Sequence, residues 1–76
     1  MVDLLNIKWN GSLAEADLTE DGSPDIAYTI KVDCNTGKIL LNTNGEMTTY
    51  IDKARDLLEE LYRSNKRPDK ARTMWY

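Results

Sequence analysis

The amphipathic stretch at residues 46–65 is the feature that most constrains the fold of this chain. Its large apolar residues recur at spacings of three and four, which places them on one side of an α-helix. These residues are Met47, Tyr50, Ile51, Ala54, Leu57, Leu58, Leu61 and Tyr62. The opposite side of the predicted helix is mostly charged. One face of this helix therefore needs a hydrophobic surface to cover, and the upstream residues must supply it.

The helix boundaries follow from residues that cap helices. Asn44 predicts an early start that keeps Met47 in the apolar face, and we prefer this start. Thr48 or Thr49 predicts a later start as the alternative. Asn65 is suited to the left-handed conformation that ends a helix.

The first two upstream segments predict a β-hairpin. In the first segment, apolar side chains alternate in the period of two that half-buried strands have. Its inward residues are Leu5, Ile7 and Trp9. Asn10-Gly11 follows directly, and this dipeptide is a strong signal for a two-residue hairpin loop. With these two residues as the loop, Trp9 pairs with Ser12.

The next two segments predict a second hairpin. The inward residues of the third strand are Ile26, Tyr28, Ile30 and Val32. A four-residue loop at residues 34–37 pairs Val32 with Ile39 and Ile30 with Leu41. We prefer this loop because a slip of one residue turns the inward side chains of a strand to the other face.

Together these elements predict an α+β fold, a four-stranded antiparallel β-meander with one C-terminal helix packed on one face. A length of 76 residues corresponds to one small domain. We assign residues 1–65 to a single ββββα domain and residues 66–76 to a basic and aromatic C-terminal tail.

The composition excludes several kinds of chemistry. The chain has no histidine, so neither a Ser-His-Asp nor a Cys-His arrangement can form. Cys34 is the one cysteine, and the carboxylate of the adjacent Asp33 raises rather than lowers the pKa of a thiol. The acidic residues at 17–25 lack the spacing of an EF-hand loop. We therefore predict no catalytic residues, no metal and no cofactor, and a protein that is not an enzyme.

Location is predicted from what the sequence lacks. No segment approaches the roughly 18 apolar residues of a membrane span, and the N-terminal residues do not resemble a signal peptide. Together with the unpaired cysteine, these features favour a cytoplasmic protein without membrane contact.

Charge divides the chain into an acidic and a basic part. Residues 1–52 hold nine acids and three lysines, a net charge of −6, whereas residues 53–76 hold seven basic residues and four acids, a net charge of +3. The basic part ends in aromatic residues, and cations beside stacking rings suit single-stranded nucleic acid or a protein partner. The candidate binding residues are Arg63, Lys66, Arg67, Lys70, Arg72, Trp75 and Tyr76. The alternatives are that Trp75 and Tyr76 fold back onto the core, or that the tail is disordered and unused.

The face of the sheet away from the helix offers a second lead. It combines two lysines with three acids, which does not suit a phosphate backbone. Leu4, Leu13 and Leu40 also fall on this face, and the strand at residues 38–43 lies at a sheet edge that can pair with another chain. A small core with an open sheet favours a homodimer.

These observations predict a small acidic, non-enzymatic cytoplasmic protein that acts by protein–protein contacts. Its partner is another protein or a second copy of the chain. The alternative is an accessory protein associated with nucleic acid through the basic and aromatic tail.

Overall fold

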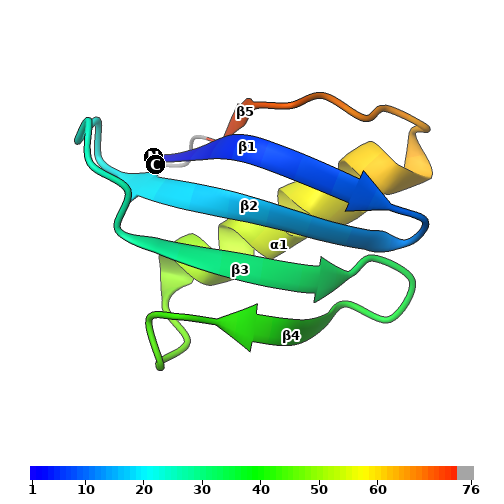
Figure 1. Cartoon of the computed structure of the whole chain (residues 1–76), viewed down its shortest axis with the longest axis horizontal. Helices are drawn as coiled ribbons and strands as arrows, with labels where there is room; N and C mark the ends of the chain where they lie inside the picture. The colour runs from blue at the N-terminus through cyan, green and yellow to red at the C-terminus, as the bar shows by residue number, and fades with distance from the viewer. Residues whose placement is uncertain (74–76) are drawn as a thin grey trace.

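The computed structural model, in which residues 1–73 are described, contains an antiparallel sheet with one helix on one face (Figure 1). The strands are β1 (Val2–Asn10), β2 (Leu13–Glu20), β3 (Tyr28–Asp33), β4 (Lys38–Asn42) and β5 (Ala71–Thr73), and the helix is α1 (Thr49–Arg63). The spatial order of the strands is β4-β3-β2-β1-β5. The α+β class and the meander of β1 to β4 are confirmed. The predicted number of four strands is wrong, because β5 adds a fifth strand beside β1.

β5 comes from the segment that the sequence predicted as a tail. It pairs with β1 in antiparallel orientation and brings Thr73 opposite Val2. Before β5, the backbone N–H of Ile7 donates to the carbonyl of Asp69 at 2.8 Å. Residues 69–73 therefore run along the outer edge of β1. A strand of three residues is too short to show a period of two in the sequence.

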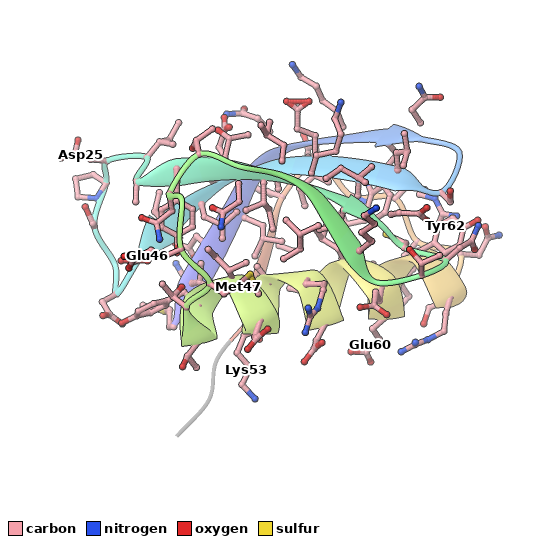
Figure 2. The ribbon with its side chains drawn as sticks, turned by 90° about the horizontal axis from the view of Figure 1, so that it is seen from below. Asp25, Glu46, Met47, Lys53, Glu60 and Tyr62 are labelled. Atoms are coloured by element: carbon pink, nitrogen blue, oxygen red, sulfur yellow. The ribbon has the colours of Figure 1, made fainter. Side chains whose placement is uncertain are left out.

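The hydrophobic core lies between the sheet and the helix (Figure 2). Ile51, Ala54 and Leu58 of α1 are fully buried. The sheet contributes the buried apolar residues Val2, Leu4, Ile7, Ala14, Ala16, Leu18, Tyr28, Ile30 and Val32. Fully burying one large aliphatic side chain contributes roughly 1.5–3 kcal/mol, so this single layer of contacts is the main source of stability.

A β-bulge at Asn6 reverses the faces of β1. The register of β1 against β2 shifts between Leu5 and Lys8, and Asn6 has a φ of +54°, a conformation that Asn tolerates better than most residues. The extra residue leaves Leu4 and Ile7 both buried in the core. The prediction that Leu5 faces the helix is therefore wrong, and Leu4 takes its place.

The loop of the first hairpin lies one residue later than predicted. Asn10 pairs with Leu13 and Trp9 pairs with Ala14, so the loop consists of Gly11 and Ser12 and the predicted pairing of Trp9 with Ser12 is wrong. Gly11 has a φ of +59°, which glycine adopts at little cost.

A second irregularity turns the end of β4 outward. Val32 pairs with Ile39, as predicted, but the register then shifts and Leu41 pairs with Lys31. The predicted pairing of Ile30 with Leu41 is therefore wrong. The side chains of Leu40 and Leu41 are 47% and 42% exposed. Ile26 also differs from the prediction, since it precedes β3 and is exposed.

The helix begins at the later of the two predicted starts. Thr48 is the N-cap, and its side chain accepts a hydrogen bond from the backbone N–H of Ile51 at 3.3 Å. Met47 lies outside the helix and is 52% exposed, so the preferred early start is wrong. The predicted stop at Asn65 is confirmed by its φ of +59°. Lys66 N–H then donates to the carbonyl of Leu61 at 2.9 Å, which completes a Schellman motif.

Candidate interaction surface

Arg67, one of the predicted binding residues, is engaged within the fold. Its guanidinium lies over the ring of Tyr62 at 4.6 Å and over the ring of Trp9 at 5.1 Å. Its Nη1 also donates to the carbonyls of Tyr62 at 3.3 Å and Leu61 at 3.4 Å, at the C-terminal end of α1. A cation at this end of a helix is favourable because the last carbonyls have no partners within the helix. Arg67 therefore joins the helix end to the first hairpin.

The indole of Trp9 continues this contact. Its Nε1 donates to the carbonyl of Pro68 at 2.8 Å. Trp9 was predicted as an inward residue of the first strand, and it packs partly buried against the core. The cation and the two rings that hold it come from β1, the end of α1 and the segment after it, so no local sequence motif links them.

The remaining predicted residues divide into one paired cation, three exposed cations and two aromatic residues. Arg72 pairs with Asp3, with its Nη2 3.0 Å from the Asp3 Oδ2, and this hydrogen bonding lowers the pKa of the Asp3 carboxyl. Arg63, Lys66 and Lys70 are exposed. The two aromatic residues of the candidate set, Trp75 and Tyr76, lie outside the described residues. Of the predicted cations, Arg67 and Arg72 thus have partners within the fold.

The open face of the sheet is the surface that α1 does not cover. Its central row crosses four strands, because Lys8 pairs with Glu15, Glu15 with Lys31, and Lys31 with Leu41. The charges along this row alternate. Within residues 1–73, none of Lys8, Glu15 and Lys31 has an oppositely charged group within ion-pair distance.

Asp17 lies two residues after Glu15 on β2. It differs from Glu15 because its carboxylate has hydrogen-bond partners within the sheet. It accepts hydrogen bonds from Thr29 Oγ1 at 2.7 Å and from Asn6 Nδ2 at 3.0 Å. These two hydrogen bonds lower the pKa of the Asp17 carboxyl, the bond from Thr29 contributing most. The Asn6 side chain thus has a partner on the open face as a direct result of the bulge. Among the described residues no side chain donates a hydrogen bond to Glu15, so its carboxylate is available to an external partner.

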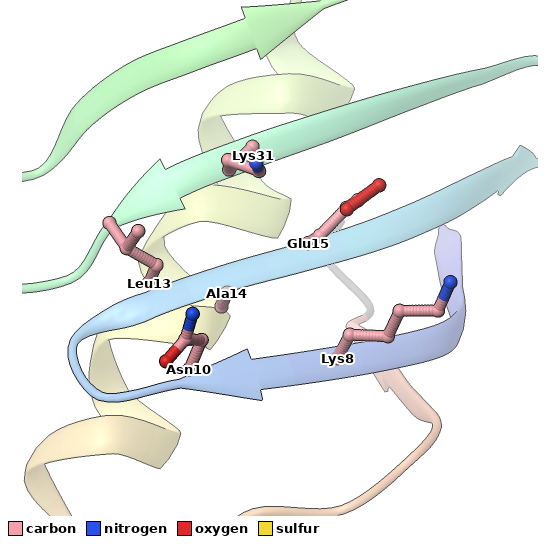
Figure 3. A pocket seen from close by; sticks show the side chains of 6 residues that line it. All are labelled: Lys8, Asn10, Leu13, Ala14, Glu15 and Lys31. Atoms are coloured by element: carbon pink, nitrogen blue, oxygen red, sulfur yellow. The ribbon is translucent and has the colours of Figure 1, made fainter.

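A shallow hollow of about 140 Å³ lies beside the charged row (Figure 3). It is lined by Lys8, Asn10, Leu13, Ala14, Glu15 and Lys31. These residues come from β1, β2 and β3, and Figure 3 shows Leu13 and Asn10 at the hairpin end of the hollow. A wider depression of about 510 Å³ follows the β5 side of the same sheet, with Leu5 and Arg72 among its lining residues.

Leucines complete the open face. The prediction placed Leu4, Leu13 and Leu40 there, and the structure corrects Leu4, which is fully buried. Leu5 and Leu13 are half-buried, whereas Leu40 is exposed. Leu5 and Leu41 were not predicted for this face, because the two irregularities in strand register change which face each residue occupies. An Asn within an alternating strand was the available signal for the first of them.

The acidic side chains and Cys34, which were considered for chemistry from the sequence, can be placed in the structure. Residues 1–73 contain no group of three or more Cys, Asp or Glu side chains that could hold a metal ion. Cys34 is buried, with its Sγ 3.7 Å from the carbonyl of Leu58, and burial raises the pKa of its thiol. Burial also raises the pKa of Tyr28 to about 12, helped by its hydrogen bond to Glu20. These groups are held in their protonated forms at neutral pH.

No helix among the described residues is long and apolar enough to cross a membrane. No protein-family model matches the chain, and no curated protein and no solved structure is significantly similar to it.

Proposed function

We propose that the protein is a non-catalytic binding domain that contacts another protein through the open face of its sheet. The observation that carries this proposal is the composition of that face. It combines exposed leucines with charged side chains that have no ion-pair partner within residues 1–73. In a contact between proteins, apolar groups that become covered give affinity and complementary charges give specificity.

The leucines are the expected source of affinity. Leu41 ends the charged row on β4, and Leu40 is its neighbour in the chain. Leu40 is 47% exposed and Leu41 is 42% exposed. A partner that covers these two residues therefore removes apolar area from water. The register shift that exposes them also disturbs the edge of β4, and bulged edges are poor templates for strand addition. A contact on the face is therefore favoured over strand pairing at this edge.

The observations favour a protein partner over nucleic acid. Glu15 and Asp17 lie in the centre of the open face and repel phosphates. In the segment after the helix, Arg67 and Arg72 already have partners within the fold. Binding of nucleic acid by that segment remains a prediction from the sequence, and no contact among the described residues adds support to it.

An affinity capture with matched variants tests the proposal. The bait is the full chain, compared with Leu41→Glu on the open face and with Thr49→Glu on the helix. Both variants add one negative charge at an exposed position. Nuclease is present during the capture. We expect the wild type and Thr49→Glu to retain the same protein and Leu41→Glu to lose it. Equal retention by all three baits would place the binding surface elsewhere.

A further inference from the structure

We propose that the protein bound by the open face is a second copy of this chain, in a two-fold symmetric dimer. The symmetry axis runs parallel to the strands, between β2 and β3, so that the two sheets pack face to face. This inference rests on the proposed function, because it assigns the occupant of the same surface. The charges of the central row carry it.

The central row is complementary to itself under this symmetry. An axis between β2 and β3 places Glu15 of one copy over Lys31 of the second copy, and Lys31 over Glu15. Lys8 then lies over Leu41, where the aliphatic stem of a lysine covers apolar surface while its ammonium stays in water. Sheets that pack face to face are about 10 Å apart, a distance that opposing Glu and Lys side chains span.

The same charges argue against the other way of stacking two sheets. An axis perpendicular to the strands and centred on this row places each residue over its own copy. Lys8 then meets Lys8, Glu15 meets Glu15 and Lys31 meets Lys31, so each contact between charged residues of the row is repulsive, and only Leu41 meets an apolar residue. Of these two axes, only the one along the strands and between β2 and β3 turns the row into pairs of opposite charge. The row therefore favours this orientation of the dimer over the perpendicular one.

The size of the face sets the expected strength. The molecule measures 29 × 22 × 22 Å, so one face has an area on the order of 600 Å². Because β5 has no counterpart in this arrangement, the dimer buries at most about 1,200 Å² in total, at or below the lower end for a specific interface. Stable interfaces of this size depend on a few apolar contacts at their centre, whereas the centre of this interface holds Glu15 and Lys31. We therefore expect a reversible dimer whose formation depends on protein concentration.

Analytical ultracentrifugation of charge-exchange variants tests the inference. Wild type is measured from about 10 µM to about 1 mM, a range that brackets a weak dimer. Glu15→Lys turns both symmetric contacts into Lys–Lys pairs, and Lys31→Glu turns both into Glu–Glu pairs. Each single variant is expected to raise the dimer dissociation constant at least about tenfold. The circular dichroism melting curve of each variant confirms that it is folded.

Restoring the pairs gives the decisive result. An equimolar mixture of Glu15→Lys and Lys31→Glu forms two Lys–Glu pairs between unlike chains, so it is expected to dimerise although neither variant does so alone. The double variant Glu15→Lys/Lys31→Glu restores both pairs within one chain type and is expected to dimerise like wild type. A mixture that stays monomeric would overturn the proposed pairing.

The remaining outcomes separate this inference from the proposed function. A wild type that is monomeric over the whole range overturns the inference. If Leu41→Glu then still loses a captured protein, the open face binds a different protein and the proposed function stands. A dimer that none of the charge variants affects places the dimer interface on another surface and overturns the inference as well.

Discussion

Replacing Arg67 with alanine tests whether the segment after the helix belongs to the fold. The guanidinium contacts the rings of Tyr62 and Trp9 at 4.6 and 5.1 Å and donates to carbonyls at the end of α1. Each cation–π contact at an exposed site contributes about 0.5–1 kcal/mol, and a cation at a helix C-terminus contributes about 0.3–1 kcal/mol. We therefore expect Arg67→Ala to lower the free energy of unfolding by about 1–3 kcal/mol.

Urea unfolding followed by far-ultraviolet circular dichroism measures this loss. This signal is preferable to fluorescence because Trp9 itself takes part in the contact. A loss of about 2 kcal/mol lowers the melting temperature of a domain of this size by about 8–16 °C. Arg67→Lys keeps the charge but loses the planar fork, so it should fall between wild type and Arg67→Ala.

Lys66→Ala is the matched control, because Lys66 is an adjacent exposed cation. It should change the free energy of unfolding by less than about 0.5 kcal/mol. If Arg67→Ala is no more destabilising than Lys66→Ala, the ring contacts do not stabilise the fold and the reasoning fails. That result would favour the prediction that the segment after the helix is a recognition tail.

Three further predictions concern the core, the open face and the buried thiol. Ala54 is fully buried, so Ala54→Leu should destabilise the protein by about 1–3 kcal/mol through overpacking; an unchanged urea midpoint would contradict the packing of α1. The pKa of Asp17 is lowered in the folded state, so the stability that it contributes is present above its unfolded pKa and is lost as the pH falls through the folded value. Asp17→Asn should therefore lose less stability than wild type between about pH 6 and pH 3, and parallel acid-induced losses would refute this. Cys34 is buried with a raised pKa, so it should react with a disulfide reagent at neutral pH only after urea unfolding; rapid labelling of the folded protein would show that the site is open.

The regular elements of the fold could be predicted because their signals are local. The spacing of apolar residues identified the helix, and Asn65 identified its end. The four-residue loop before Lys38 correctly gave the pairing of Val32 with Ile39. These features depend on residues close together in the sequence, where periodicity and turn chemistry are informative.

The strand faces could not be predicted beyond each irregularity. One extra residue at Asn6 exchanges the inward and outward positions of β1, so Leu4 replaces Leu5 in the core. The shift in β4 likewise exposes Leu41. Whether a strand contains an extra, bulged residue depends on its packing against the helix and the neighbouring strand. The alternation of apolar and polar residues does not show where such a bulge lies.

The candidate surface was predicted in part. Lys8, Glu15 and Lys31 lie on the open face, where the sequence predicted lysines and acids, but their pairing in one row was not predicted. The reason is that β2 is displaced by two residues against β1 relative to the predicted hairpin, since Trp9 pairs with Ala14 rather than Ser12. The contact of Arg67 with Trp9 joins residues that are 58 positions apart in the printed sequence. A contact between such distant residues depends on how β1 and the end of α1 come together, which charge and aromatic content do not reveal.

The pairing of Val2 with Thr73 places the two ends of the described chain next to each other. A short peptide that joins these neighbouring positions would leave every strand of the sheet in place, and new termini could be opened in the exposed loop at residues 21–26. Such a circular permutant should keep the same architecture. The arrangement also means that β1 receives its second neighbour only after β2, β3, β4 and α1 have been synthesised.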